Sequence, residues 1–294
     1  MKKIGILLCD TANPFWREKI VHYRGLAASF GFDALLRAAG DPLDPEEQCR
    51  ELQRMAEESR DDAGRGERGY AAVVVNPLTD ANLLPALHRL PFPVFDAGPK
   101  CDPERTAGIG NYFPVPVADF EEQGFLAGEA LISGTEPAGD GWALILGGFC
   151  DARQSAMRCR GAFKAFRERF AREHIVTAYA DFDGEHAFRT VKELASKLDF
   201  QAVFCANDLM ALGAVRALRE SRPESAVPVA GVDAIPEALQ ALEDGDPFRS
   251  RLFCTVGLPH EEVVRGVYST VSEWFKGVPP SRKPLVRSVL AKKS

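Results

Sequence analysis

The sequence lacks any long apolar run, which argues against a membrane-spanning helix. Such a helix needs roughly 18 or more consecutive apolar residues. The first residues, MKKIGILLCD, begin with two lysines as a signal peptide does, but their apolar stretch runs only from Ile4 to Leu8 and ends at Asp10. This stretch is too short for the apolar region of a signal peptide, so it predicts a first buried strand instead. We expect either that an export signal has been removed from the sequence or that the protein works inside the cell.

The sequence also lacks the motifs of common catalytic and cofactor sites. It contains no GxSxG elbow, no Walker loop and no GxGxxG after a predicted strand. The five histidines are scattered, and His260-Glu261-Glu262 is not the HExxH zinc motif. Nothing selects a carboxylate pair for glycoside chemistry from the 42 acidic residues. We therefore expect a protein without catalytic activity, metal or cofactor.

Paired cysteines and basic clusters are absent as well. The seven cysteines show no CxxC and no metal-type spacing, and Cys9, Cys205 and Cys254 lie in apolar runs where cysteine acts as a small hydrophobic residue. An odd number of isolated thiols is more typical of a reducing compartment. The formal net charge is −6, and no Lys/Arg cluster is flanked by aromatic residues. This composition argues against nucleic-acid binding by the chain itself.

Short apolar runs alternate with longer amphipathic stretches along the whole sequence. Several runs, such as Ala71–Val75, are apolar at every position, which is typical of parallel strands buried on both faces. Strands that alternate with helices form βαβ units with right-handed crossovers. The pattern predicts a doubly wound α/β protein with strands at Ile4–Leu8, Phe32–Leu36, Ala71–Val75, Pro93–Asp96, Trp142–Leu146, Val176–Ala180, Ala202–Ala206, Val227–Val232 and Leu252–Val256.

The alternating pattern divides into two comparable halves. A chain of 294 residues exceeds the usual size of one domain. The second set of strands begins near Gly110, and no Pro/Ser-rich linker precedes it. We therefore expect two lobes joined by extended crossovers.

Polar and aromatic side chains follow several of the predicted strands. In open parallel sheets, ligands bind beyond the carboxyl ends of the strands. Carboxylates and amides bond to sugar hydroxyls, and an aromatic ring covers the apolar face of a pyranose. These side chains predict a site for a small polar ligand such as a sugar. They are Asn13, Phe15, Trp16, Asp96, Asn111, Asn207 and Asp233.

Five segments occur in an order that is typical of one known group of proteins. They are Asn13-Pro14-Phe15-Trp16, Val75-Asn76-Pro77, Ala180-Asp181-Phe182-Asp183, the run FCANDLMALGA from Phe204 to Ala214, and the run GVDAIPEAL from Gly231 to Leu239. Together they resemble the ribose-binding-protein group of periplasmic solute-binding proteins, whose fold is shared with the effector domain of the lactose-repressor family. The resemblance covers essentially the whole chain.

The resemblance implies two Rossmann-like lobes joined by a hinge of three crossovers, with a ligand buried between them. Residues 1–109 and 258–280 would form the N-terminal lobe, and residues 110–257 and 281–294 the C-terminal lobe. The group uses an arginine that opens a helix in the second lobe. We expect Arg158 in this role, although spacing alone does not separate it from Arg160. The other ligand-binding roles fall to Asn13, Phe15, Trp16, Asp96, Phe182, Asn207 and Asp233.

The sequence departs from the ribose-binding pattern at two polar positions. Ribose binders have an arginine after the fourth-strand aspartate, where this chain has Ala97, and a glutamine at the third crossover, where it has Gly257. Because two polar partners are missing and Trp16 adds aromatic area, we expect a different sugar or a sugar-like ligand.

Several of these residues also have a purely structural interpretation. Asp208 is a good N-cap for the helix that follows it. Asn207 could serve only the turn into that helix, and Asp233 could cap a helix that begins at Pro236. Asn13-Pro14 could be simple turn chemistry.

The leading functional interpretation is a substrate-binding component of an ATP-binding-cassette importer. Such a protein would close a hinge around a sugar in the periplasm and deliver it to a membrane permease. The alternative is a ligand-sensing effector domain, either of a lactose-repressor-type regulator in the cytoplasm or of a signalling receptor. An enzyme acting on a sugar or nucleotide is a third class, which the absent catalytic motifs do not favour.

Overall fold

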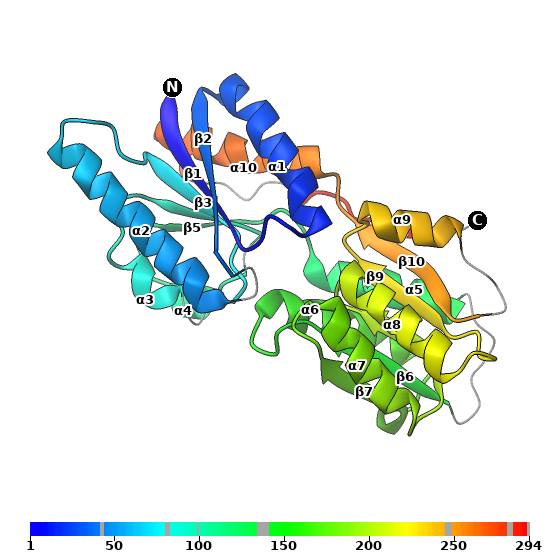
Figure 1. Ribbon diagram of the computed structural model, residues 1–294. Coiled ribbons are helices and arrows are strands. Elements are labelled where there is room, and N and C mark those ends of the chain that lie inside the picture. Colours follow the sequence, from blue (N-terminus) through cyan, green and yellow to red (C-terminus); the bar gives the residue numbers. More distant parts are fainter. Residues whose placement is uncertain are drawn as a thin grey trace. The chain divides into compact units, whose positions relative to one another are not determined.

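The computed structural model describes residues 1–41, 44–79, 83–98, 100–133, 141–244, 249–280 and 285–292. The chain divides into two compact units, Met1–Ala118 with Pro259–Val286 and Asp119–Leu258 with Arg287–Ser294. It therefore passes three times from one unit to the other. Each unit is built around one sheet that is covered by helices (Figure 1). None of the described helices is long and apolar enough to span a membrane.

The first unit contains a five-stranded parallel sheet in the order β2-β1-β3-β4-β5. In Figure 1, α1 and α10 lie along one face of this sheet and α2, α3 and α4 along the other. The strands are β1 (Lys2–Leu8), β2 (Phe32–Ala38), β3 (Ala72–Val75), β4 (Val94–Ala97) and β5 (Tyr112–Val115); the helices are α1 (Pro14–Ala27), η1 (Ala28–Phe30), α2 (Pro45–Gly64), α3 (Leu84–Leu87), α4 (Pro103–Thr106) and α10 (His260–Phe275).

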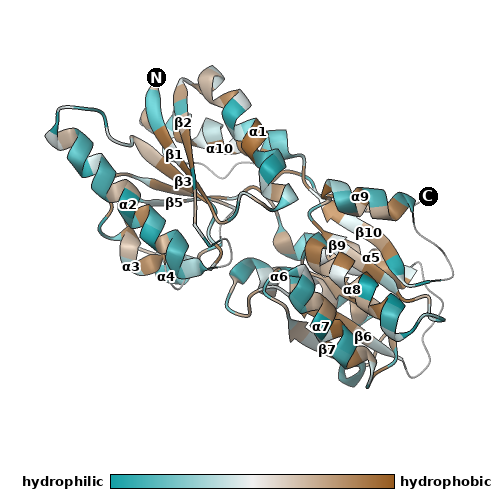
Figure 2. Ribbon diagram, viewed as in Figure 1, coloured by the Kyte–Doolittle hydropathy of each residue, from teal (hydrophilic) through white to brown (hydrophobic). Residues whose placement is uncertain are grey.

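Successive residues of a strand point to opposite faces of the sheet. Because successive residues of strands such as β3 are apolar and buried, both faces of the first sheet are apolar. On one face, Leu7 and Val75 pack in a single core cluster with Leu52 of α2. On the α1 and α10 side, the Tyr268 hydroxyl donates a hydrogen bond to the carbonyl of Tyr23 at 2.8 Å. The strands are accordingly apolar in Figure 2, whereas the helices combine apolar and polar residues. With both faces covered, the strand ends are the places where polar side chains can meet a ligand.

The second unit contains a six-stranded sheet in the order β11-β10-β9-β8-β6-β7, in which only β11 is antiparallel to its neighbour. Helix α5 packs against α6, and α7 packs against α8. The strands are β6 (Trp142–Gly147), β7 (Ile175–Tyr179), β8 (Phe200–Cys205), β9 (Pro228–Val232), β10 (Arg251–Gly257) and β11 (Val289–Lys292); the helices are α5 (Phe120–Ser133), α6 (Arg153–Phe166), η2 (Arg172–His174), α7 (Gly184–Ala195), α8 (Asp208–Ser221) and α9 (Pro236–Glu243).

Helices α5 and α6 approach each other closely because glycine lines their contact. A Cβ atom on Gly124 would lie 1.9 Å from the carbonyl oxygen of Arg158, and one on Gly161 would lie 2.0 Å from that of Glu121. Any other residue at these positions would force the helices apart. The close approach brings Gln123 of α5 within hydrogen-bond distance of the Arg158 side chain.

The expected α/β class with parallel sheets is confirmed, and each of the nine expected strands is present. The structure adds β5 and β11. The segment of β5 contains Pro114, and β5 is an edge strand, where proline is tolerated. β11 is a short edge strand of only four residues.

The division between the units differs from the expected one at residues 110 and 280. Because β5 pairs with β4, the chain up to Ala118 belongs to the first unit. The first unit also extends to Val286, whose amide donates a hydrogen bond to the carbonyl of Val117 at 2.9 Å. The expected boundaries were therefore several residues too early.

Candidate functional site

Arg158 of α6 lies near the carboxyl ends of strands in the second unit and is only 2% exposed. Its Nε donates a hydrogen bond to the Gln123 side chain at 3.0 Å, and its Nη1 donates to the carbonyl of Ala206 at 2.7 Å. Its Nη2 donates to Oδ1 of Asp233 at 3.1 Å. Arg160 instead is exposed and forms a surface ion pair. Arg158 is therefore the arginine that meets the residues following β8 and β9.

Asp233 begins a strained turn directly after β9. Its φ is 120° and that of Ala234 is 54°, in a region that non-glycine residues rarely adopt. Two side chains hold this turn. The Ala234 amide donates to Oγ1 of Thr255 at 3.1 Å, and the Ile235 amide donates to Oδ2 of Asp208 at 2.9 Å. Helix α9 begins after Ile235 without a side-chain cap, so the alternative of Asp233 as a helix cap is wrong.

Asp208 is a fully buried carboxylic acid at the first residue of α8, and the expectation that it is the N-cap is wrong. Its Oδ1 accepts a hydrogen bond from the Thr255 hydroxyl at 2.7 Å. Gly231 permits this position, because a Cβ atom there would lie 2.1 Å from that oxygen. Burial raises the pKa of Asp208 to about 7, and the charge of Asp233 adds to the rise. Asp208 thus supports the turn that presents Asp233.

Asn207 is the N-cap of α8 and also fixes the loop after β7. Its Oδ1 accepts from the Met210 amide at 2.9 Å, and its Nδ2 donates to the carbonyl of Phe182 at 3.0 Å. Phe182 and Asp181 have φ values of 59° and 51°, so this turn is strained as well. Asn207 therefore does cap α8, as its structural interpretation expected. Because a side-chain amide has two N–H donors and two lone pairs, hydrogen-bonding capacity remains for a ligand.

Phe182 itself is half-buried in the loop that Asn207 fixes. Its ring meets that of Phe149 edge to face, with the centroids 6.0 Å apart. A Cβ atom on Gly148 would lie 2.3 Å from the ring, so glycine is required where the chain passes beneath it. Phe182 thus lies with the loops that follow β6 and β7, at the same end of the sheet as Asn207.

Asn13, Phe15 and Trp16 lie at the start of α1 in the first unit. Asn13 caps this helix by accepting a hydrogen bond from the Phe15 amide at 3.0 Å. The rings of Phe15 and Trp16 meet edge to face at 4.8 Å. Trp16 is only 6% exposed, and the ammonium groups of Lys19 and Lys100 each lie 5.1 Å from its ring centroid. Phe15 therefore offers more open aromatic surface than Trp16.

Asp96 is wholly buried at the carboxyl end of β4. Its Oδ2 accepts from the Tyr112 hydroxyl at 2.6 Å and from the amides of Lys100 and Cys101 at 2.9 and 3.2 Å. Burial raises the pKa of Asp96, and the hydrogen bond from Tyr112 opposes this rise. Oδ1 has no hydrogen-bond partner among the described residues. A buried acceptor of this kind is suited to a ligand hydroxyl.

Asn111 lies at the opposite edge of the first sheet. It precedes β5, and its carbonyl accepts from the amide of Val94, the first residue of β4, at 2.7 Å. Its Nδ2 donates to the carbonyl of Leu87 at 2.9 Å. Because β4 and β5 are parallel, Asn111 is at the amino edge and Asp96 at the carboxyl edge. The placement expected for Asn111 is therefore wrong, and its side chain holds the segment after α3.

Comparison with known proteins identifies the family to which the chain belongs. Residues 4–250 match the sequence model of the periplasmic binding protein domain. The chain belongs to the periplasmic binding protein family. It is 31% identical over 219 residues to the ribose import binding protein of Escherichia coli (strain K12), covering 71% of this chain and 67% of that protein. It is 24% identical over 247 residues to the D-allose-binding periplasmic protein of the same organism, covering 82% of this chain and 76% of that protein.

Solved structures of periplasmic binding proteins share the fold. An ABC transporter periplasmic solute binding protein from Actinobacillus succinogenes 130z, with bound D-allose, matches with a TM-score of 0.82 at 20% identity, over 99% of this chain and 98% of that one. The Caulobacter myo-inositol binding protein, bound to myo-inositol, matches with a TM-score of 0.77 at 20% identity, over 99% and 93%. Neither these proteins nor the curated relatives support the alternative of a transcriptional regulator.

In this periplasmic binding protein, the residues that support the expected site were not among those predicted from the sequence. Thr255 is the clearest case, because a hydroxyl within the buried strand β10 needs a partner and finds Asp208. That isolated polar position was a usable signal. Gln123 gave no comparable signal, because its contact with Arg158 depends on how α5 and α6 pack.

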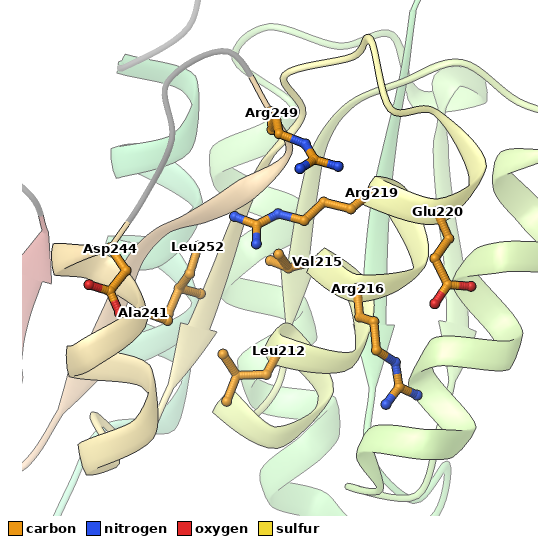
Figure 3. Close-up of a pocket in the computed structure, with 9 residues that line it drawn as sticks. All are labelled: Leu212, Val215, Arg216, Arg219, Glu220, Ala241, Asp244, Arg249 and Leu252. Atoms are coloured by element: carbon orange, nitrogen blue, oxygen red, sulfur yellow. The ribbon is translucent and has the colours of Figure 1, made fainter.

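A separate hollow lies between α8 and α9, beside the first residues of β10. Figure 3 shows Arg219 and Arg249 extending over an apolar floor that includes Leu212 and Leu252. Because Leu252 is near the amino end of β10, this hollow lies away from the carboxyl edge at which Asp233 is found. Among the described residues, no group of three or more His, Cys, Asp or Glu could hold a metal ion.

Proposed function

We propose that this protein is the solute-binding component of an ATP-binding-cassette importer. In this proposal it works in the periplasm and hands a sugar or sugar-like ligand to a membrane permease. The observation that carries the proposal is the meeting of Arg158, Asp233 and Asn207 around the carboxyl ends of the second sheet. The family membership and the sugar-binding relatives named above support the same assignment.

Each unit would contribute the carboxyl edge of its sheet to ligand binding. In the first unit, Asn13, Phe15 and Asp96 supply an amide, an aromatic ring and a buried acceptor. Contact with one unit first, followed by polar contacts from the other, would favour the closed form. Such closure requires that the ligand bind the closed form better than the open one.

The ligand in this proposal is not ribose. Ala97 offers no polar group where the ribose-binding pattern has an arginine. At the position of the expected glutamine, a Cβ atom on Gly257 would lie 2.5 Å from that of Ala234. The strained Ala234 turn therefore occupies the space into which a side chain at Gly257 would project.

A thermal-shift screen tests the proposed function. The panel contains neutral sugars, polyols, sugar acids and sugar phosphates, and we expect at least one compound to raise the melting temperature because it binds only the folded state. The Asp233→Asn variant should lose most of that shift, whereas Asp199→Asn, at an exposed carboxylate of the second unit, should keep it. If no compound shifts the wild-type protein, the sugar-binding function is wrong. Mass spectrometry should recover the bound compound unchanged, and turnover would instead indicate an enzyme.

A further inference from the structure

Two lysine side chains converge on Trp16 in the first unit. Lys19 lies in the second turn of α1, and its side chain runs back toward the start of the helix, as helical side chains do. Its Nζ lies 5.0 Å from the ring centroid of Phe15 and 5.1 Å from that of Trp16. Lys100 comes from the loop after β4, and its Nζ also lies 5.1 Å from the Trp16 centroid. The two ammonium groups are therefore at most about 10 Å apart.

Both lysines are buried, which is unusual for this residue. Lys19 is 5% exposed and Lys100 is 7% exposed, whereas lysine is almost never buried unless it is paired. The aromatic rings offset part of the cost of desolvation. Each lysine also has a further interaction within the protein. Because an ammonium group carries three N–H donors, such a partner still leaves donors that a ligand can use.

The positive charge reaches the carboxyl edge of the first sheet, where the proposed ligand-binding residues lie. Burial raises the pKa of the Cys9 thiol at the end of β1 to about 11, and the charges of Lys100 and Lys19 oppose this rise. The nearby carboxylate of Asp10 is already engaged, because its two oxygens accept from the amides of Ala12 and Asn13 at 2.6 and 3.1 Å. This edge thus combines two buried cations with the Asp10 carboxylate, whose oxygens are bonded to the backbone, and the open acceptor Oδ1 of Asp96.

We propose that the ligand is an anionic sugar, whose carboxylate or phosphate group lies against the ammonium groups of Lys19 and Lys100. This inference rests on the sugar-binding function proposed above and specifies the ligand class. Sugar hydroxyls would bond to Asp96 and to the polar groups of the second unit. An ammonium group attracts an anionic oxygen through its charge as well as through a hydrogen bond, so an anion gains from two buried cations a Coulombic attraction that a neutral sugar lacks.

Matched pairs of sugars test the ligand class by isothermal titration calorimetry. The neutral members are D-ribose, D-glucose and D-galactose; their anionic counterparts are D-ribose 5-phosphate for ribose, D-glucuronate and D-glucose 6-phosphate for glucose, and D-galacturonate for galactose. We expect an anionic member to bind at least tenfold more tightly than its neutral counterpart. The carboxylates and phosphates separate the two sources of negative charge. Equal or tighter binding of a neutral sugar overturns the anionic ligand but leaves the sugar-binding function intact, whereas no binding by any member contradicts both.

Charge-removing variants test the two lysines. Lys19→Met and Lys100→Met keep the aliphatic stem but lose the ammonium group, so affinity for the anionic sugar should fall about ten- to a hundredfold while affinity for its neutral counterpart does not fall. Lys192→Met, at an exposed lysine of the second unit, should change neither affinity. If Lys19→Met lowers the melting temperature, Lys100→Gln in the loop carries the same test. An equal loss for neutral and anionic sugars would overturn the assignment of the lysines.

Discussion

The guanidinium of Arg158 donates a hydrogen bond to the carboxylate of Asp233 at 3.1 Å, across 75 positions of the sequence. The two side chains are only 3% and 10% exposed, so this ion pair is largely removed from water. A buried charge without its partner is strongly unfavourable. The pair therefore links α6 to the turn after β9 and keeps a charged carboxylate at the carboxyl edge of the second sheet.

Removing the Arg158 charge should destabilise the protein and abolish ligand binding. In Arg158→Met, the Asp233 carboxylate and the Ala206 carbonyl lose a donor, so we expect the free energy of unfolding to fall by about 3–5 kcal/mol. Arg160→Met is the matched control two residues along the same helix, where an exposed ion pair contributes less than about 1 kcal/mol. Urea unfolding of both variants checks the difference. Similar losses in the two variants would contradict the structural role of Arg158.

Two substitutions at Asn207 separate its two hydrogen bonds. Asn207→Asp keeps the acceptor that caps α8 but loses the N–H that donates to the Phe182 carbonyl. Asn207→Ala loses both, so we expect its stability to fall by about 1–2 kcal/mol more than that of Asn207→Asp. Both variants should bind ligand weakly, because the strained loop after β7 is no longer fixed. Wild-type affinity in Asn207→Asp, measured by calorimetry, would show that the link to Phe182 does not matter.

The fold was predictable because its main signals are local. Runs such as Ala71–Val75 are apolar at every position, and a strand buried on both faces requires such a run. The strand β5 was not predicted. Its segment contains Pro114, a residue that normally interrupts strands, and only the sheet order shows that β5 is an edge strand, where proline is tolerated. The predicted boundary between the units was therefore also wrong, because its position depends on which sheet β5 joins.

In the candidate site, only the residues that follow a recognisable strand could be placed from the sequence. Asp96, Asn207 and Asp233 each follow a recognisable strand, and the structure places them at carboxyl ends. Asn111 was misplaced because the unrecognised strand β5 begins right after it. The choice between Arg158 and Arg160 depends on which face of α6 is buried, and the spacing of the residues alone does not determine that face.

Asn111 should prove important for stability but not for ligand binding. Its side chain ties the amino edge of the first sheet to the Leu87 carbonyl, so Asn111→Ala should lower the free energy of unfolding by about 1 kcal/mol. Ligand affinity should stay within a factor of two of wild type. Asn13→Ala, at the opposite edge, serves as the contrasting variant and should lose affinity. A loss of affinity in Asn111→Ala without a loss of stability would show that Asn111 takes part in ligand binding.

Asp208 should make the stability of the protein depend on pH. Burial raises its pKa to about 7 from an ordinary value of 3.8, so between these pH values the folded state binds more protons than the unfolded state. The contribution of Asp208 to stability is therefore greatest below about pH 4 and is lost as the pH rises to about 7. The shift corresponds to roughly 4 kcal/mol.

The Asp208→Asn variant isolates this effect. His260, whose pKa burial lowers to about 4, acts in the opposite direction but is present in both proteins, so the difference between wild type and variant reports Asp208 alone. Urea unfolding from pH 4 to pH 8 should show the wild type losing stability relative to Asp208→Asn as the pH rises. Asp199→Asn, which alters an exposed carboxylate, should follow the wild type. Parallel pH profiles for wild type and Asp208→Asn would mean that Asp208 does not take up a proton in this range, and that the Asp233 turn is held by an ionised carboxylate at neutral pH.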